Sequence, residues 1–135
     1  MIYLLVGTGG IIGSLLRYYL GLFTHSWWSY DFPLGTLLVN LIGCFVLGWF
    51  TNRIVKLKQF HPHVLAGLGT GLVGSFTTFS TFSVETVTLI QHHLVGLALL
   101  YVLLSLFGGL MMSWLGYDLG HRSFKRLQEK GERTS

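Results

Sequence analysis

Four long apolar runs with few charges constrain this chain more than any other feature of its sequence. They cover residues 2–23, 34–50, 64–90 and 94–117. A helix needs about 20 predominantly apolar residues to cross the hydrocarbon core of a bilayer. The four runs therefore predict an all-α membrane protein with four transmembrane helices in each subunit.

The composition excludes several other classes of protein. Only 10% of the residues are charged and 51% are hydrophobic, whereas soluble domains carry about 25% charged residues. A chain of 135 residues has too much surface to bury so much apolar material in its own core, which excludes a soluble enzyme and a disordered tail. Cys44 is the single cysteine, so a secreted module held by intrachain disulfides is excluded as well.

The basic residues lie in two clusters beside the apolar runs. Arg53–Lys58 and Arg122–Arg133 hold all the Lys and Arg of the chain except Arg17, and the first and third connections hold none. Such clusters are typical of cytoplasmic segments on anionic lipid rather than of nucleic-acid binding. With four spans, both termini are expected in the cytoplasm. We expect a membrane domain at residues 1–119 and a basic soluble tail at residues 120–135.

The third run is too long and too rich in glycine to be an ordinary span. Its 27 residues would form a helix of about 40 Å, against a hydrocarbon thickness of about 30 Å. The stretch Gly67–Ser83 is rich in glycine, serine and threonine, which are poor helix formers. Either a tilted helix or a helix broken in mid-membrane fits these features. A break is tolerated only where protein or water surrounds the backbone.

Several motifs point to sites that the sequence does not complete. Gly69–Gly74 matches the dinucleotide pattern G-x-G-x-x-G, but no strand precedes it, so we expect no nucleotide site. The six histidines fall in connections or at helix ends, and no cysteine or carboxylate cluster completes a metal site with them. No Ser-His-Asp set or carboxylate pair is present, so we expect no enzyme.

The polar side chains inside the runs are almost all neutral hydrogen-bond donors. Such donors without central acids suit a small anion that loses its water, although a hydrogen bond between helices is the favoured role for any single serine or threonine. Glu85 lies near a segment end, and Arg17 is expected to extend toward the first connection. The neutral residues are Thr36, Asn40, Thr77, Thr78, Ser80, Thr81, Ser83 and Ser105.

Aromatic residues accompany these donors. Phe79 and Phe82 share a face if the backbone is helical, and the positive edge of a phenyl ring can contact an anion. Tyr101 and Ser105 are four residues apart and share a face in the same way. Taken singly, all four residues also suit ordinary helix packing.

Three motifs occur in order along the chain. They are Gly9–Gly13 followed by Arg17 and Tyr18, then Gly35–Gly43, then Gly74–Ser83. These motifs resemble those of the Fluc (CrcB) fluoride channels, and the resemblance covers all four runs in order. It implies four-helix subunits with a third helix broken in mid-membrane, paired as an antiparallel dual-topology dimer. It also implies passive export of fluoride through the cell membrane, which would protect the cell from this ion.

The resemblance assigns roles to individual residues. Asn40 would be the amide donor of the fluoride pathway, and Phe79 and Phe82 its paired phenyl rings. A structural Na⁺, which is not transported, would be held by the backbone carbonyls of Gly74 and Thr77 from both subunits. The remaining pathway positions would be Ser80, Thr81, Ser83, Tyr101 and Ser105, with Glu85 near the vestibule.

Alternatives remain for the partner and for the function. The strong bias of Lys and Arg favours one fixed orientation, which would require an oppositely oriented homologue as the partner. A second copy of the chain, inserted in the opposite orientation, is the other possible partner. A small multidrug-type proton-coupled antiporter would need a membrane-embedded glutamate on its first helix, where this chain has only Arg17. In a non-transporting assembly subunit, the buried hydroxyl groups would only join helices.

Overall fold

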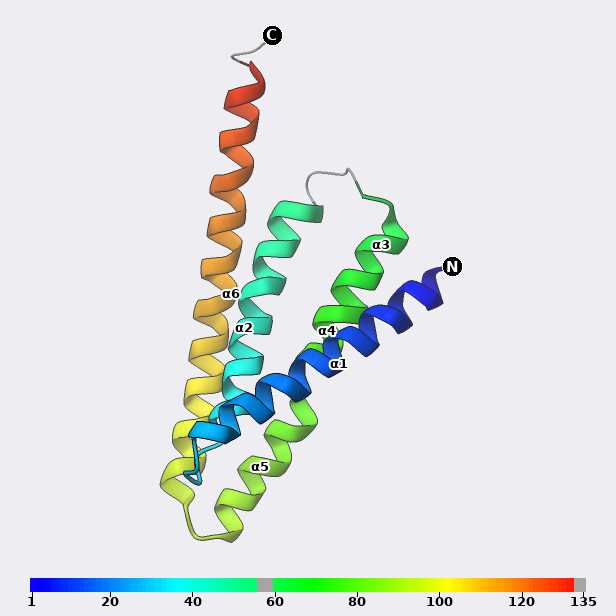
Figure 1. Cartoon of the computed structure of the whole chain (residues 1–135). Helices are drawn as coiled ribbons and strands as arrows, with labels where there is room; N and C mark the ends of the chain where they lie inside the picture. Colours follow the sequence, from blue (N-terminus) through cyan, green and yellow to red (C-terminus); the bar gives the residue numbers. More distant parts are fainter. Residues whose placement is uncertain (56–59, 133–135) are drawn as a thin grey trace.

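The computed structural model describes the backbone of residues 1–55 and 60–132 and the side chains of residues 1–54 and 60–122. The predicted basic residues Lys56 and Lys58, and the basic side chains beyond Arg122, lie outside these ranges. The described chain is helical between short connections (Figure 1). Its helices are α1 (Ile2–Trp27), α2 (Leu34–Phe50), α3 (Pro62–Ala66), α4 (Gly74–Phe76), α5 (Phe79–Gln91) and α6 (Val95–Glu132), with π-helical segments η1 (Thr51–Val55) and η2 (Gly67–Val73).

Three of the predicted spans are long apolar helices. Within the described residues, Ile2–Trp27, Leu34–Ile54 and Val95–Arg122 are long and apolar enough to cross a membrane. The predicted third span is instead a succession of shorter helices, from α3 to α5. The tail predicted at residues 120–135 begins inside α6, which continues without interruption to Glu132.

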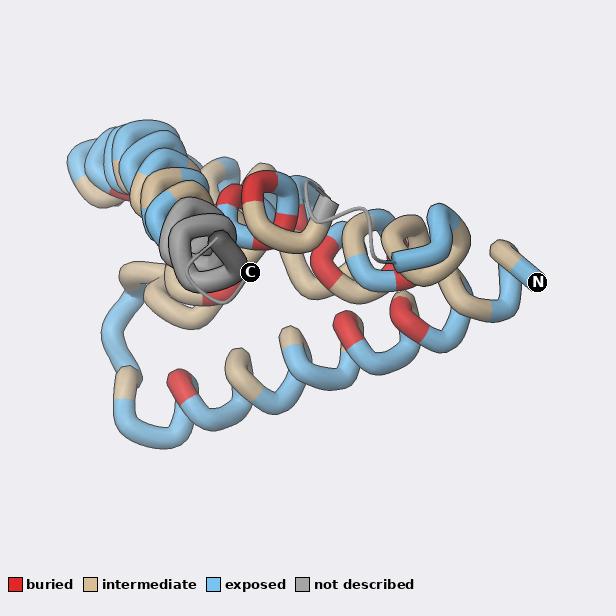
Figure 2. The backbone as a smooth tube through the Cα atoms, turned by 90° about the horizontal axis from the view of Figure 1, so that it is seen from above, coloured by how far each residue is buried: buried red, intermediate tan, exposed pale blue. Residues whose placement is uncertain are grey.

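Close backbone contacts hold α1 against the third run. Helix α1 crosses η2 and α4, while α2 lies along α6 (Figure 1). The buried residues of α1 face the other helices, and its outer side is exposed (Figure 2). A Cβ on Gly13 would collide with Leu72 O and Ser75 Oγ, and one on Gly71 would lie 2.6 Å from Val6 O. Small residues at these positions let the helices approach closely, as is common in lipid.

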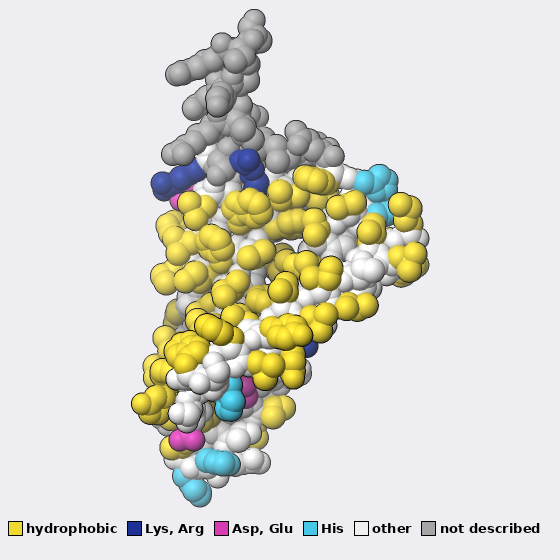
Figure 3. All heavy atoms as spheres, in the orientation of Figure 1, with side chains coloured by type: hydrophobic (Ala, Val, Ile, Leu, Met, Phe, Trp, Pro, Cys, Tyr) yellow, Lys and Arg dark blue, Asp and Glu magenta, His cyan; other side chains and the backbone are white. Residues whose placement is uncertain are grey.

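The buried core lies where α2, α5 and α6 meet. Leu37, Leu89, Ala98 and Tyr101 form it, with Phe82 packed against them. Elsewhere, large apolar side chains remain exposed along the helices and cover most of the visible face (Figure 3). An apolar surface of this extent requires lipid or another protein chain as its surroundings.

The third run changes direction at two threonines. Helix α4 ends at Phe76, and Thr77 (φ −76°, ψ 158°) and Thr78 (φ −148°, ψ 123°) have extended backbone angles before α5 begins at Phe79. The Thr78 hydroxyl accepts a hydrogen bond from Thr81 N at 3.2 Å and so caps α5, as threonine commonly does at a helix start. We call these two residues the Thr77–Thr78 junction.

Candidate functional site

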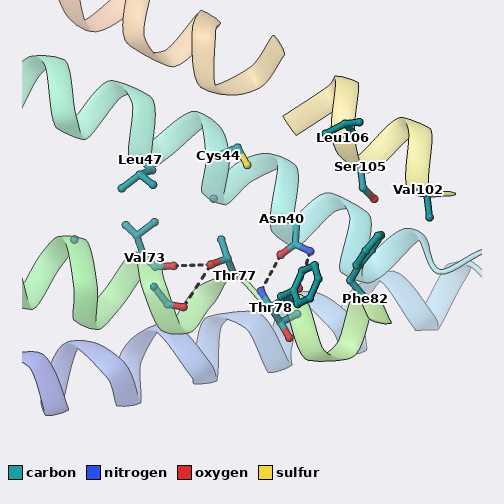
Figure 4. A pocket seen from close by; sticks show the side chains of 14 residues that line it. Asn40, Cys44, Leu47, Val73, Thr77, Thr78, Phe82, Val102, Ser105 and Leu106 are labelled. Carbon is teal, nitrogen blue, oxygen red and sulfur yellow. Dashed lines mark hydrogen bonds between the residues drawn. The ribbon is translucent and has the colours of Figure 1, made fainter. Parts of the chain in front are cut away.

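The side chain of Asn40 pairs with the backbone of the Thr77–Thr78 junction. From α2, its Nδ2 donates to Thr78 O at 2.9 Å, and Thr78 N donates to its Oδ1 at 2.8 Å (Figure 4). The amide therefore replaces the helical hydrogen bonds that the extended backbone cannot make. One of the two hydrogens on Nδ2 remains for another acceptor.

Two carbonyl groups, that of Gly74 before the junction and that of Thr77 within it, have lost their helical donors. In a continuous helix, Gly74 O would accept from the amide of Thr78, and Thr77 O from the amide of Thr81. These amides donate instead to Asn40 Oδ1 and to Thr78 Oγ1. Gly74 O retains only a long contact from Thr77 Oγ1, at 3.4 Å. Gly74 O and Thr77 O therefore lack a backbone amide donor and can accept from other groups.

Arg17 lies against the junction, which corrects the expectation that it extends toward the first connection. Its Nη1 donates to Thr77 O at 3.3 Å. Because α1 packs against the third run, the guanidinium reaches a backbone oxygen of that run. Among the described side chains the one ion pair is Arg122–Asp118, at 2.8 Å, so Arg17 has no carboxylate within 4.0 Å.

A cavity of about 550 Å³ lies on the other side of the junction, between α2, the third run and α6. Its polar lining consists of amide and hydroxyl groups from Asn40, Thr77, Thr78 and Ser105, and no carboxylate lines it (Figure 4). The Ser105 Oγ is buried without a hydrogen-bond partner. A buried hydroxyl of this kind is costly unless a ligand or water satisfies it.

Two phenyl rings complete the lining of this cavity. The ring centroids of Phe79 and Phe82 lie 5.7 Å apart with an interplanar angle of 37°. Phe82 also packs against Tyr101, with a centroid distance of 5.1 Å. Phe79 is 80% exposed, so the subunit alone does not cover it.

One known protein family matches most of the chain. The family described as "CrcB-like protein, Camphor Resistance (CrcB)" matches residues 4–117. The chain belongs to the CrcB family. Together with the long apolar helices, this membership makes it a multi-pass protein of the cell membrane.

Curated CrcB relatives share sequence over most of the chain. "Fluoride-specific ion channel FluC 1" of Bacillus anthracis is 54% identical over 132 residues, which cover 98% of this chain and 96% of the relative. "Fluoride-specific ion channel FluC 2" of Geobacillus kaustophilus is 48% identical over 117 residues, covering 87% and 91%. "Fluoride-specific ion channel FluC 1" of Moorella thermoacetica is 43% identical over 119 residues, covering 88% and 85%.

The structure of this CrcB protein brings together only part of the predicted pathway. Asn40, Phe79, Phe82 and Ser105 line the cavity of 550 Å³. Thr81 lines a second cavity of about 310 Å³ on the α1 side, together with Arg17, Thr36 and Thr78. Ser80 Oγ lies 3.4 Å from Thr78 Oγ1, and Ser83 Oγ donates to Phe79 O at 2.9 Å.

Glu85 and Tyr101 bind each other outside the larger cavity. Tyr101 Oη donates to Glu85 Oε2, and Thr36 Oγ1 donates to Oε1, both at 2.8 Å. Tyr101 is 0% exposed. The carboxylate is therefore held by two hydroxyl groups from α2 and α6, and it lines a third cavity of about 200 Å³ near His25 and Asp31.

Thr78 and Arg17 are the residues that sequence reasoning left out of the site. Thr78 lines both larger cavities and pairs with Asn40. Threonine is one of the residues preferred immediately before a helix, and this preference could have placed the start of α5. No local signal links Arg17 to Thr77, which lies 60 positions away.

Proposed function

We propose that this protein is a fluoride-selective channel that exports F⁻ passively down its electrochemical gradient and so confers fluoride resistance. The observation that carries the proposal is the cavity beside the junction, which is lined by amide and hydroxyl donors and two phenyl rings and by no carboxylate. A path for cations or protons would be expected to contain acids there. The naming of the CrcB relatives as fluoride-specific ion channels supports the same function.

The chemistry of the lining suits a small halide. Fluoride is strongly hydrated, so a selective path must replace its water with donors at close quarters. Asn40 Nδ2 has a second hydrogen, and Ser105 Oγ has no protein partner. The edges of Phe79 and Phe82 can add positive potential without a formal charge. A path narrow enough to do this would fit a larger anion such as chloride poorly.

The working unit of the proposal is an antiparallel dimer. Phe79, on the wall of the cavity, is largely exposed in the single subunit, and a second subunit would cover it. The partner is a second copy or an oppositely oriented homologue. In this dimer the third run crosses the membrane as one broken span, with the Thr77–Thr78 junction at mid-depth, where the partner surrounds its freed backbone groups.

A structural Na⁺ would bind at the carbonyls of Gly74 and Thr77 in this proposal. The amides that would otherwise bond to these oxygens donate elsewhere, and carbonyl oxygens are hard ligands suited to hard cations. Thr77 O accepts from Arg17, and its second lone pair would face the ion. One subunit offers two ligands and its partner would supply the rest. The ion would raise the local potential for the anion that passes nearby.

Fluoride efflux from proteoliposomes tests the proposed function. Vesicles loaded with potassium fluoride and containing the purified protein should release F⁻ to an external fluoride electrode once valinomycin relieves the charge imbalance. Matched vesicles loaded with chloride should release little. Flux that requires a proton gradient would instead indicate an antiporter, and no flux, alone or with its homologous subunit, would indicate an assembly subunit.

A further inference from the structure

We propose that Arg17 is a positioning residue that fixes the Thr77–Thr78 junction from the side of α1. This inference rests on the proposed function, because the junction forms one wall of the proposed fluoride pathway. The contact that carries it is the hydrogen bond from Arg17 Nη1 to Thr77 O, at 3.3 Å. The amide of Thr81 is already bonded to Thr78 Oγ1, so Arg17 is the one donor to Thr77 O in the described part of the chain.

The packing of α1 explains why the guanidinium reaches this oxygen. Gly9, Gly13 and Arg17 recur every four residues and share one face of α1. A Cβ on Gly13 would collide with Leu72 O and Ser75 Oγ, and Ser75 Oγ donates to Gly10 O at 2.9 Å. The backbone of α1 is therefore seated directly against the segment before the junction. Arg17, one turn further on, comes to lie at the junction itself.

The charge of Arg17, inside a membrane-spanning helix, is consistent with a functional role. An arginine inside a membrane span is costly and is by default a functional residue. Within the described ranges it has no carboxylate partner and one hydrogen bond, although a guanidinium has five N–H donors. It also lines the 310 Å³ cavity with Thr36 and Thr78. An arginine that only anchored the helix end would point to the membrane surface.

Asn40 and Arg17 thus hold the junction from opposite sides. Asn40 pairs with Thr78 from α2, and Arg17 binds Thr77 O from α1. Phe79 follows immediately and begins α5. Loss of Arg17 should therefore loosen the extended backbone and displace the first turn of α5, which carries both phenyl rings, without unfolding α6.

Hydrogen exchange and fluoride efflux of four variants test this role. In Arg17→Ala, peptides covering residues 74–83 should exchange at least tenfold faster than in the wild type, while peptides within 95–117 stay unchanged. Efflux should fall at least tenfold in Arg17→Ala and in Arg17→Gln. Arg17→Lys keeps a charged donor and should stay within threefold of the wild type in both measurements. Tyr18→Leu alters the residue next to Arg17, which lines the 310 Å³ cavity with it, and should match the wild type in both exchange and efflux.

Three results would overturn the inference. They are unchanged exchange at residues 74–83 in Arg17→Ala, equally faster exchange along the whole chain, or efflux at the wild-type rate in that variant. If Arg17→Ala yields no folded protein, Arg17→Gln is judged by the same criteria. If the wild type itself passes no fluoride, the proposed function fails, and the exchange pattern alone decides the role of Arg17.

Discussion

Tyr101 gives its hydroxyl hydrogen to Glu85 rather than to the cavity beside the junction. The two oxygens lie 2.8 Å apart, and the tyrosine ring is fully buried between Phe32 and Phe82. This bond joins α6 to α5 across the core. It places the hydroxyl of a predicted pathway residue in a structural contact between two helices.

The substitution Tyr101→Phe should therefore act through stability. A hydrogen bond to a carboxylate contributes about 1.5–3 kcal/mol, and phenylalanine keeps the ring while it leaves Glu85 Oε2 without this donor. The midpoint of thermal unfolding in detergent should fall by several degrees, whereas Tyr19→Phe, at an exposed position, should leave it unchanged. An unchanged midpoint together with lost fluoride efflux would show that the hydroxyl serves the pathway directly.

Asn40→Asp should nearly abolish fluoride efflux. The carboxylate loses the donor to Thr78 O and places a negative charge on the cavity wall. At an effective dielectric constant of about 20, two unit charges about 5 Å apart repel by about 3 kcal/mol, which corresponds to more than a hundredfold in rate. Ile42→Ala, at an exposed position of α2 outside this cavity, is the control and should keep the wild-type rate. Efflux of Asn40→Asp above a tenth of that rate would contradict the donor role of the amide.

Replacement of either phenyl ring should reduce fluoride efflux, but only one replacement should lower the stability of the protein. Phe79→Ile and Phe82→Ile should each reduce efflux at least tenfold, because an aliphatic side chain lacks the positive ring edge. Phe82 packs on the core, so Phe82→Ile should also lower the unfolding midpoint in detergent. Phe79 is exposed in the subunit, so Phe79→Ile should leave the midpoint unchanged. Phe107→Ile, at an exposed position of α6, is the control and should change neither quantity. Wild-type efflux in both variants would refute a phenyl-lined path.

The sequence predicted the helical class and the positions of the long apolar helices well, because lipid requires apolar runs of a defined length. It also indicated irregular backbone in the third run, but for a partly different reason from the one observed. The glycines of η2 stay helical, and Gly71 serves the close approach of α1 to that segment. The extended residues are Thr77 and Thr78, where a side-chain cap replaces the helical bonds.

Contacts between distant residues were beyond the reach of sequence patterns. The bonds from Arg17 to Thr77 O and from Tyr101 to Glu85 join different helices, and helical periodicity carries no information on which faces of two helices meet. Arg17 and Glu85 are each the single charged residue of their apolar run, so the sequence marks them out. The partner of each depends on packing that only the structure supplies.

Removal of sodium should weaken both flux and stability if the carbonyls of Gly74 and Thr77 hold Na⁺. Replacement of Na⁺ by N-methylglucamine on both sides of the vesicles should reduce fluoride efflux at least tenfold, and return of Na⁺ should restore it. In detergent, the unfolding midpoint should rise with Na⁺ concentration, since a ligand that binds only the folded state stabilises it. Equal efflux and an equal midpoint without Na⁺ would exclude the site.

Gly13→Ala and Gly10→Ala form a matched pair that tests the seating of α1. A Cβ on Gly13 would collide with Leu72 O and Ser75 Oγ, whereas one on Gly10 would meet nothing within 4 Å. Overpacking typically costs about 1–3 kcal/mol, while alanine in place of a helical glycine with open space around it gains up to about 1 kcal/mol. Gly13→Ala should therefore lower the unfolding midpoint and, by moving α1 away, withdraw Arg17 from Thr77 O and reduce efflux. Gly10→Ala should keep full efflux and an equal or higher midpoint, and equal behaviour of the two variants would show that α1 is not held by this contact.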